Sequence, residues 1–413
     1  MPRSWMTIDA VDKTKLGLIN GEAMNVTSYV SLNRVILKLT GLYPKNLPRT
    51  LAVAFFMLLI VVPQIQQIYH SSDLSVILET SSVLLTIILA LLKMIVWTSR
   101  RREIDDLITF MFGEYWNMAK QRSETGASCF LGYASFAKKF TRCYVFLVFN
   151  ALLVFYTSPL VQIYNFDIQG SSNRTRPFFF PGMYPEGWTE SPFYQLALLS
   201  QVVATIACAA LILAVDTLIA TTLFHTCGHF RILQINLESL GDNTINLTEK
   251  RKNAGSLTNT ARQKLATCIK HHQIILKFSK NVDRLFNPIM LCQVLASNLI
   301  ICLVGLQVTS APTDRSKGAK YFSYLMMALF QLILFCFPGD GLISQSLAVS
   351  EAAYATKWFK LSKNLKTDVR LIIVRSQKPA KITAGKFNVM CLEHLATVLS
   401  ASMSYFTVLR SLS

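Results

Sequence analysis

Three groups of residues in this chain have types and spacings that could support chemistry. His225 and His229 bracket Cys227 at a spacing that could bind zinc, but no carboxylate or second cluster accompanies them, so the pattern favours a structural role. Lys93 and Asp216 are ionisable groups within long apolar segments, where such groups are often functional. No nucleophile, metal-binding or phosphate-binding motif is apparent elsewhere. We therefore expect no enzyme, no metal site and no cofactor.

The third group lies near the C-terminus. Ala396, Ser400 and Ser404 recur at every fourth position, and Val408 and Leu412 continue the same spacing. Side chains four residues apart share one face of a helix. Such a stripe of small and hydroxyl side chains can line a water-filled path or allow close packing of helices. The residues alone leave both interpretations open.

The two intramembrane charges have simpler interpretations. Lys93 lies close to the cationic end of its apolar segment, so we expect its ammonium group to extend to the membrane interface. Asp216 lies about 35 Å along its own segment, at 1.5 Å per residue, and is expected near the inner surface.

The composition indicates an integral membrane protein. The 413 residues include 41 Lys and Arg against 23 Asp and Glu, a net charge of +18, yet only 15% are charged and 52% are hydrophobic. Soluble domains carry about 25% charged residues. The composition therefore excludes a secreted disulfide scaffold, a disordered chain and an ordinary soluble enzyme. Nucleic acid is not an expected partner, whereas membrane lipids are.

Seven apolar segments are long enough to cross a bilayer as helices, which takes about 20 residues. They show no period of two, so we expect an all-α integral membrane fold with seven transmembrane helices. The segments are Leu51–Pro63 with an extension to Tyr69, Leu74–Trp97, Phe140–Tyr164, Phe193–Phe224, Pro288–Val308, Tyr321–Pro338 and Phe387–Leu409.

The distribution of cations predicts the orientation. Of the 41 Lys and Arg residues, 34 fall on one side of the predicted membrane and six on the other, with Lys93 inside a span. The positive-inside rule places the N-terminus in the cytoplasm and the C-terminus outside. Asn173 lies in a glycosylation sequon of a predicted outer loop, and none of the nine cysteines lies in an outer loop.

Several inner segments are amphipathic or longer than the membrane requires, which predicts an intracellular helical anchor domain. The anchor could serve as an assembly platform or as a bundle within one subunit. The expected organisation is a cytoplasmic N-terminal segment, six transmembrane helices with cytoplasmic extensions, cytoplasmic anchor helices and a last helix, at residues 1–50, 51–346 (extensions 225–287), 347–386 and 387–413.

Three regions in the C-terminal half resemble the insect odorant receptors. The first resembles their fifth span, the second their sixth span and the third the tyrosine-centred end of their last helix. These regions are His271–Ile274 with Phe286–Pro288 and Gln293–Ser297, then Phe335–Asp340 with Ala352–Trp358, and then Ser404–Leu409. Length, number of spans and inverted orientation agree with the family over the whole chain.

The resemblance implies an odorant-gated, nonselective cation channel of four subunits around one pore. The chain lacks the long inner insertion of the family's co-receptor, so it resembles an odour-tuning subunit that assembles with that co-receptor. The implied location is the plasma membrane of an olfactory neuron dendrite. The implied ligand is a small volatile odorant.

The resemblance also implies roles for individual residues. Val408 and Leu412 match the family's hydrophobic constriction, and Ser400 and Ser404 would line the pore below it. The odorant site would lie in the outer halves of spans two, three, four and six. Its candidate residues are Leu85, Phe149, Leu153, Tyr156, Thr205, Tyr321 and Tyr324.

Other classes remain as alternatives. A gustatory-type receptor channel would end in a Thr-Tyr and Gln-Phe pattern, whereas this chain has Ser404 and no such Gln-Phe. A G-protein-coupled receptor with seven helices would have the opposite orientation and an outer disulfide. A transporter would show repeated halves or broken helices with charges at the membrane midplane.

Overall fold

The computed structural model describes residues 26–120, 124–169, 176–185, 187–188, 190–248, 254–310, 315–356 and 358–412, and nearly all of them are helical. Two short strands form the only sheet among these residues. The elements are α1 (Val26–Thr40), α2 (Leu47–His70), α3 (Leu74–Ser99), α4 (Arg101–Phe110), the π-helix η3 (Met111–Tyr115), α5 (Trp116–Lys120), α6 (Glu124–Gln169), α7 (Phe193–Thr248), α8 (Ala254–Ser310), α9 (Arg315–Ala355), the 3₁₀ helix η4 (Trp358–Lys360), α10 (Lys363–Ser376), β1 (Thr383–Ala384), β2 (Asn388–Val389) and α11 (Leu392–Leu412).

The all-α membrane fold is confirmed. Within the described residues, α2, α3, α6, α7, α8 and α9 are each long and apolar enough to cross a membrane. Helix α11, with 21 residues, supplies the seventh apolar helix. Pro63, Pro159, Pro288 and Pro338 all lie inside helices without ending them. Neighbouring helices in a membrane bundle can satisfy the backbone groups that such prolines leave open.

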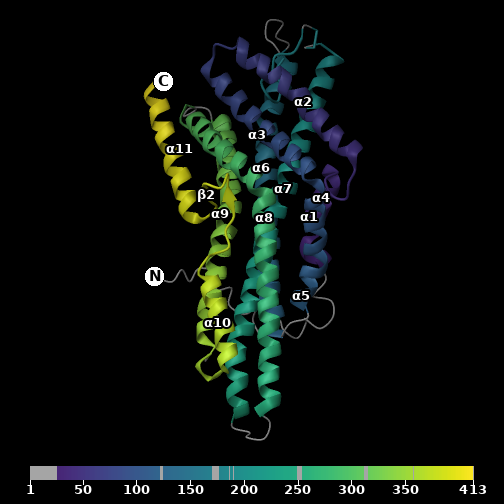
Figure 1. The fold of residues 1–413 in the computed structure, drawn as a ribbon. Helices are drawn as coiled ribbons and strands as arrows, with labels where there is room; N and C mark the ends of the chain where they lie inside the picture. Colours follow the sequence, from purple (N-terminus) through teal and green to yellow (C-terminus); the bar gives the residue numbers. More distant parts are fainter. Residues whose placement is uncertain are drawn as a thin grey trace.

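Helices α6, α7, α8 and α9 are all longer than a bilayer requires, and α7 and α8 are the longest of them. Helices α7 and α8 have 56 and 57 residues, and at 1.5 Å per residue each is about 85 Å long, against about 30 Å of hydrocarbon. The amphipathic segment before Pro288 and the span after it are one continuous helix. Figure 1 shows α7 and α8 as a long pair that extends far below α2 and α3, with α10 beside the lower part of α9.

The last helix begins later than the sequence pattern predicted. Residues before it form a hairpin in which Thr383 pairs with Val389 and Ala384 with Asn388. Gly385, Lys386 and Phe387 make the three-residue turn, with φ of 63° at Gly385 and 68° at Lys386. Phe387 therefore lies at the end of a turn, and α11 starts only at Leu392. Helix α9, in turn, is continuous across the expected boundary at residue 346.

Lys93 does not extend to the membrane interface. Its side chain is fully buried, and its Nζ lies 2.6 Å from Oδ1 of Asp216, which is also fully buried. A buried ammonium group is stable only when it is paired and hydrogen-bonded. The expectation of an interfacial Lys93 is therefore wrong, because its partner lies on another helix and could not be read from the surrounding sequence.

The carboxylate of Asp216 joins four helices. Besides Lys93 of α3, Tyr144 of α6 donates from its hydroxyl at 3.3 Å and Gln331 of α9 donates from Nε2 at 2.7 Å. Asp216 itself belongs to α7, which packs extensively against α6 and α9. We call Lys93, Tyr144, Asp216 and Gln331 the polar hub.

The polar hub predicts that a single substitution in the ion pair lowers the stability of the protein more than a double substitution does. Asp216→Asn leaves the ammonium group of Lys93 buried without a counter-charge, and we expect this to lower the free energy of unfolding by about 3–5 kcal/mol. Lys93→Met combined with Asp216→Asn removes both charges and retains an oxygen acceptor for Gln331, so most of the stability should return. Thermal unfolding of the protein purified in detergent measures the stability of both variants. Equal stability of the Asp216→Asn single variant and the unmodified chain would contradict the role of the pair.

Candidate functional site

A cavity of about 90 Å³ lies between α3, α6, α7 and α9, in the halves of these helices that the loop charges place towards the outside, and its lining is almost entirely apolar. Four helices supply most of the lining, and α2 and the segment before α7 complete it. The lining residues are Ile60 of α2, Val83, Thr86 and Ile87 of α3, Val148, Ala151, Leu152 and Phe155 of α6, Thr205, Cys208, Ala209 and Ile212 of α7, Tyr324 and Met327 of α9, and Phe180. Of these, Phe180 precedes α7 in the chain.

Two hydroxyl groups form the main polar feature of the cavity. The hydroxyls of Thr86 and Tyr324 are hydrogen-bonded to each other, and that of Tyr324 also donates to the Ser82 carbonyl oxygen at 3.0 Å. The hydroxyl of Thr205 donates to the Gln201 carbonyl oxygen at 2.5 Å. The hydroxyls are thus engaged with the protein, and a ligand in this cavity would meet mostly hydrocarbon.

The outer end of the cavity is held by two sets of contacts. Gln201 fixes Phe180 by accepting from its backbone N–H and donating to its carbonyl oxygen, both at 3.2 Å. Lys320 forms an ion pair with Glu79, and its Nζ lies 4.8 Å above the ring of Phe155. Phe155 and Phe180 then stack at 5.9 Å between ring centroids, which closes this end with aromatic surface.

Two of the seven predicted ligand-site residues line the cavity. They are Thr205 and Tyr324. Phe149 and Leu153 instead lie on the outward face of α6, with 63% and 51% of their surface exposed in the single chain. The cavity is lined instead by Val148 and Leu152, each one position earlier on α6. Successive side chains of a helix point about 100° apart, so neighbouring residues lie on different faces.

The other three candidates lie near the cavity without lining it. Tyr321 is buried and donates from its hydroxyl to Glu79 at 3.0 Å, so it belongs to the ion pair at the outer end. Tyr156 packs against Phe179 at 5.1 Å. Leu85 is partly buried against the hydrophobic core.

The sequence reasoning did not identify several cavity residues. Phe180 and Ile60 come from a loop segment and from span one, which the resemblance did not include in the site. The run Phe178–Phe180 in a predicted outer loop was a usable signal, because three consecutive aromatic side chains outside the membrane need a surface to pack on.

The stripe of residues at every fourth position on α11 lies on the face of the helix that points away from the rest of the chain. Ala396, Ser400 and Ser404 are exposed, and Val408 is 56% exposed. Helix α11 packs against α8 and α9, with Val398 and Ser402 buried on its opposite face. Figure 1 shows α11 at the edge of the bundle. Leu412 is the last residue of α11, and the structure describes its main chain but not its side chain.

The histidines flanking Cys227 point to different partners. His229 Nδ1 lies 3.1 Å from His271 Nε2, and the thiol of Cys227 lies 3.9 Å from the Pro338 carbonyl oxygen. His225 packs among aromatic rings, with Trp116 and Phe130 both at 5.5 Å. Within the described part of the chain, no group of three or more His, Cys, Asp or Glu side chains could hold a metal ion. Asn173 of the sequon lies outside the described residues.

These features define a multi-pass membrane protein of the all-α class, with an apolar cavity between helices and an exposed stripe on its last helix. Residues 73–403 match the family model described as "7tm Odorant receptor". The chain belongs to the odorant receptor family of insects. At the level of family, this selects the odorant receptors over the gustatory-type and G-protein-coupled alternatives.

Individual relatives agree with this assignment. The chain is 26% identical to odorant receptor 13a of Drosophila melanogaster, over 82% of this chain and 81% of the relative. It is 31% identical to the odorant receptor coreceptor of Aedes aegypti, over 42% of this chain and 36% of that protein. The fold is similar to that of olfactory receptor OR5 of Machilis hrabei in complex with eugenol, with a TM-score of 0.79 and 18% identity, over 95% of this chain and 100% of that one.

Proposed function

We propose that this chain is the odour-tuning subunit of a ligand-gated, nonselective cation channel. In this proposal a small volatile odorant binds in the cavity between α3, α6, α7 and α9. Binding of the odorant opens a hydrophobic gate on α11 that includes Val408 and Leu412. Ser400 and Ser404 line the pore below this gate. The channel is a hetero-oligomer, a tetramer, with the odorant co-receptor in the plasma membrane of olfactory neuron dendrites.

The cavity is the observation that carries the ligand half of the proposal. Volatile molecules offer few hydrogen-bonding groups, so an apolar enclosure with a few placed polar groups is the chemistry that suits them. The paired hydroxyls of Thr86 and Tyr324 can exchange their mutual hydrogen bond for one to an alcohol, phenol or carbonyl group. We therefore expect ligands with a hydrocarbon body and at most one or two polar groups, as in eugenol.

The exposed stripe on α11 supports the channel half of the proposal. A helix that packs on its own subunit with one face and leaves small and hydroxyl side chains open on the other is suited to line a path shared with other subunits. Under the orientation predicted from the loop charges, Val408 lies near the outer mouth. A ring of valines there can exclude water and block ions.

A recording in oocytes tests the proposal as a whole. The chain is expressed with an odorant co-receptor and exposed to eugenol, linalool, ethyl butyrate and geranyl acetate without added nucleotide. We expect an odorant-evoked cation current that survives inhibition of G proteins. A current abolished by that inhibition would favour a G-protein-coupled mechanism instead.

Adjacent leucines on α6 give a matched test of the cavity. Leu152→Ala removes hydrocarbon from the lining, whereas Leu153→Ala does the same on the outward face. Because lost methylene contacts in an apolar pocket are worth tenfold or more, Leu152→Ala should shift the half-maximal odorant concentration about tenfold and alter the ranking of the panel. Leu153→Ala should leave both nearly unchanged. The same effect from both variants would exclude the cavity as the site.

Substitution of the proposed gate gives the second test. Val408→Ser places a hydroxyl group in the constriction, which should admit water and raise the current in the absence of odorant severalfold. Val374→Ser is the control, because Val374 is similarly exposed, at 63%, but lies on α10. An odorant-free current and ion selectivity equal to those of the unmodified channel would remove Val408 from the gate.

A further inference from the structure

The polar hub lies directly beneath the cavity on the same four helices. Tyr144 precedes the lining residue Val148 by four positions on α6, and Asp216 follows Ile212 by four on α7. Gln331 likewise follows Met327 by four on α9. One helical turn, about 5.4 Å, therefore separates the cavity from the hub on each of these helices. Lys93 completes this level from α3, six residues beyond Ile87.

The cavity is too small for an odorant unless its walls move. Its volume is about 90 Å³, whereas a cavity that binds benzene in another protein measures about 150 Å³. A ligand larger than benzene must therefore displace the lining side chains or the helices that carry them. These helices are held together one turn below by hydrogen bonds and an ion pair at 2.6–3.3 Å. A displacement in the cavity must either stop at the hub or be passed through it.

Helix α9 continues from the hub towards α11. Every fourth residue along it lies at a contact: Met327 lines the cavity, Gln331 bonds Asp216, and the ring of Phe335 lies 5.8 Å from Nζ of Lys93. The next position is Gly339, where a Cβ atom would lie 2.1 Å from the carbonyl oxygen of Met390. We call these four residues the α9 stripe.

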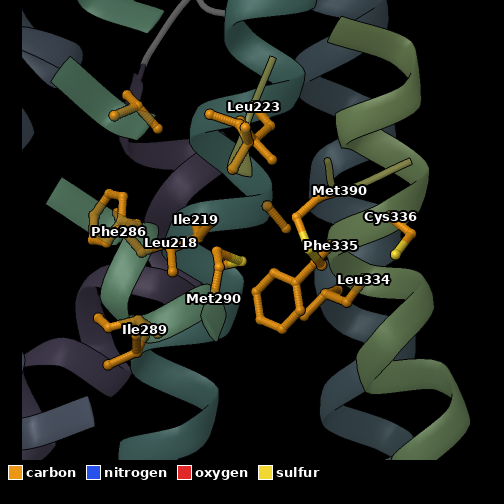
Figure 2. Packing of buried hydrophobic residues seen from close by; sticks show 14 of the residues in the cluster. Leu218, Ile219, Leu223, Phe286, Ile289, Met290, Leu334, Phe335, Cys336 and Met390 are labelled. Carbon is orange, nitrogen blue, oxygen red and sulfur yellow. The ribbon is translucent and has the colours of Figure 1, made fainter. Parts of the chain in front are cut away.

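The stripe ends at the segment that leads into the last helix. Met390 lies two residues before α11 and is fully buried. Figure 2 shows Met390 beside Phe335, within the cluster that also contains Met290 of α8 and Leu218 of α7. At Gly339 the backbones of α9 and of this segment touch without an intervening side chain. A shift of α9 therefore moves the start of α11 directly.

We propose that the polar hub and the α9 stripe are the positioning residues that transmit odorant occupancy from the cavity to α11. This inference rests on the proposed function, since it concerns how that channel is opened. Expansion of the cavity displaces α9 at Met327. The hub holds α9 to α3 and α7 at its own level, so that α9 tilts about this level, and the contact of Gly339 with Met390 passes the tilt to α11. Asp216 and Gly339 act at a distance from both ligand and pore.

Three variants test the transmission in oocytes with the co-receptor and the same four odorants. Gln331→Leu removes the hydrogen bond between α9 and Asp216 while the ion pair stays. Lys93→Met with Asp216→Asn removes the ion pair without leaving a lone charge. Gly339→Ala forces α9 away from Met390. Because allosteric coupling is typically worth 5- to 150-fold, each should reduce the odorant-evoked current per surface receptor about tenfold. The ranking of the odorants should not change, since the cavity is intact.

Matched controls separate transmission from folding. Gln345→Leu also removes a buried amide from α9, where it accepts from Gln234 at 3.1 Å, and Gly113→Ala places a Cβ where nothing lies within 4 Å. Both should respond like the unmodified receptor at equal surface density, which labelling of an extracellular tag measures. If Gly339→Ala fails to reach the surface, Gln331→Leu and the double variant decide the question.

The outcomes distinguish this inference from the function on which it rests. An unmodified receptor that gives no current with any odorant overturns the proposed function. An unmodified receptor that responds, with Gln331→Leu and the double variant responding equally at equal surface density, overturns the transmission alone. A change in odorant ranking comparable to that of Leu152→Ala would place the hub within the ligand site and would also overturn it.

Discussion

The arrangement of this bundle depends on one buried ion pair. Removing an ammonium group and a carboxylate from water costs several kcal/mol for each ion, and their attraction compensates only when the remaining hydrogen-bonding capacity is also used. Asp216 meets this condition with donors from three other helices. A hydrogen bond tolerates a change of only a few tenths of an ångström in its donor–acceptor distance. Helices α3, α6, α7 and α9 must therefore keep one mutual position at this level. Apolar packing above and below is non-directional and imposes no such requirement.

The cavity occupies the part of the bundle that lacks this constraint. The hub fixes the helices at its inner end, and the ion pair of Lys320 with Glu79 holds α3 and α9 together at its outer end. Between these two polar levels the helices contact each other mainly through hydrocarbon and the hydroxyl pair of Thr86 and Tyr324. Side chains there can repack without leaving a charge unpaired. If the cavity is the odorant site, as proposed above, the side chains that would contact a ligand can move while the helices are held at both ends of the cavity.

Hydropathy predicted the spans well because few structures other than a helix allow twenty apolar residues to cross a bilayer. The expected segment Leu74–Trp97 and the observed α3 (Leu74–Ser99) differ by two residues. The pairing of Lys93 with Asp216, across 123 residues of sequence, has no local signature and could not be found. On α6 the residues predicted for the ligand site lie one position away from those that line the cavity, because a segment that is apolar on all sides does not show which face turns inward. The contribution of Phe180 to the cavity depends on how the segment before α7 folds back against the helices.

The succession of contacts along α9 separates the residues that line the cavity from those that hold the helix to its neighbours. The cavity residues lie towards the start of α9, where a change from one apolar side chain to another alters the shape of the cavity and little else. Gln331 of the hub and Gly339 lie further along the helix, and at Gly339 an added methyl group would meet the backbone of Met390. One continuous helix carries both sets. In the proposed transmission, any ligand that displaces the cavity end of α9 therefore produces the same movement at Gly339, so that selectivity for the odorant can vary while the response to its binding stays the same.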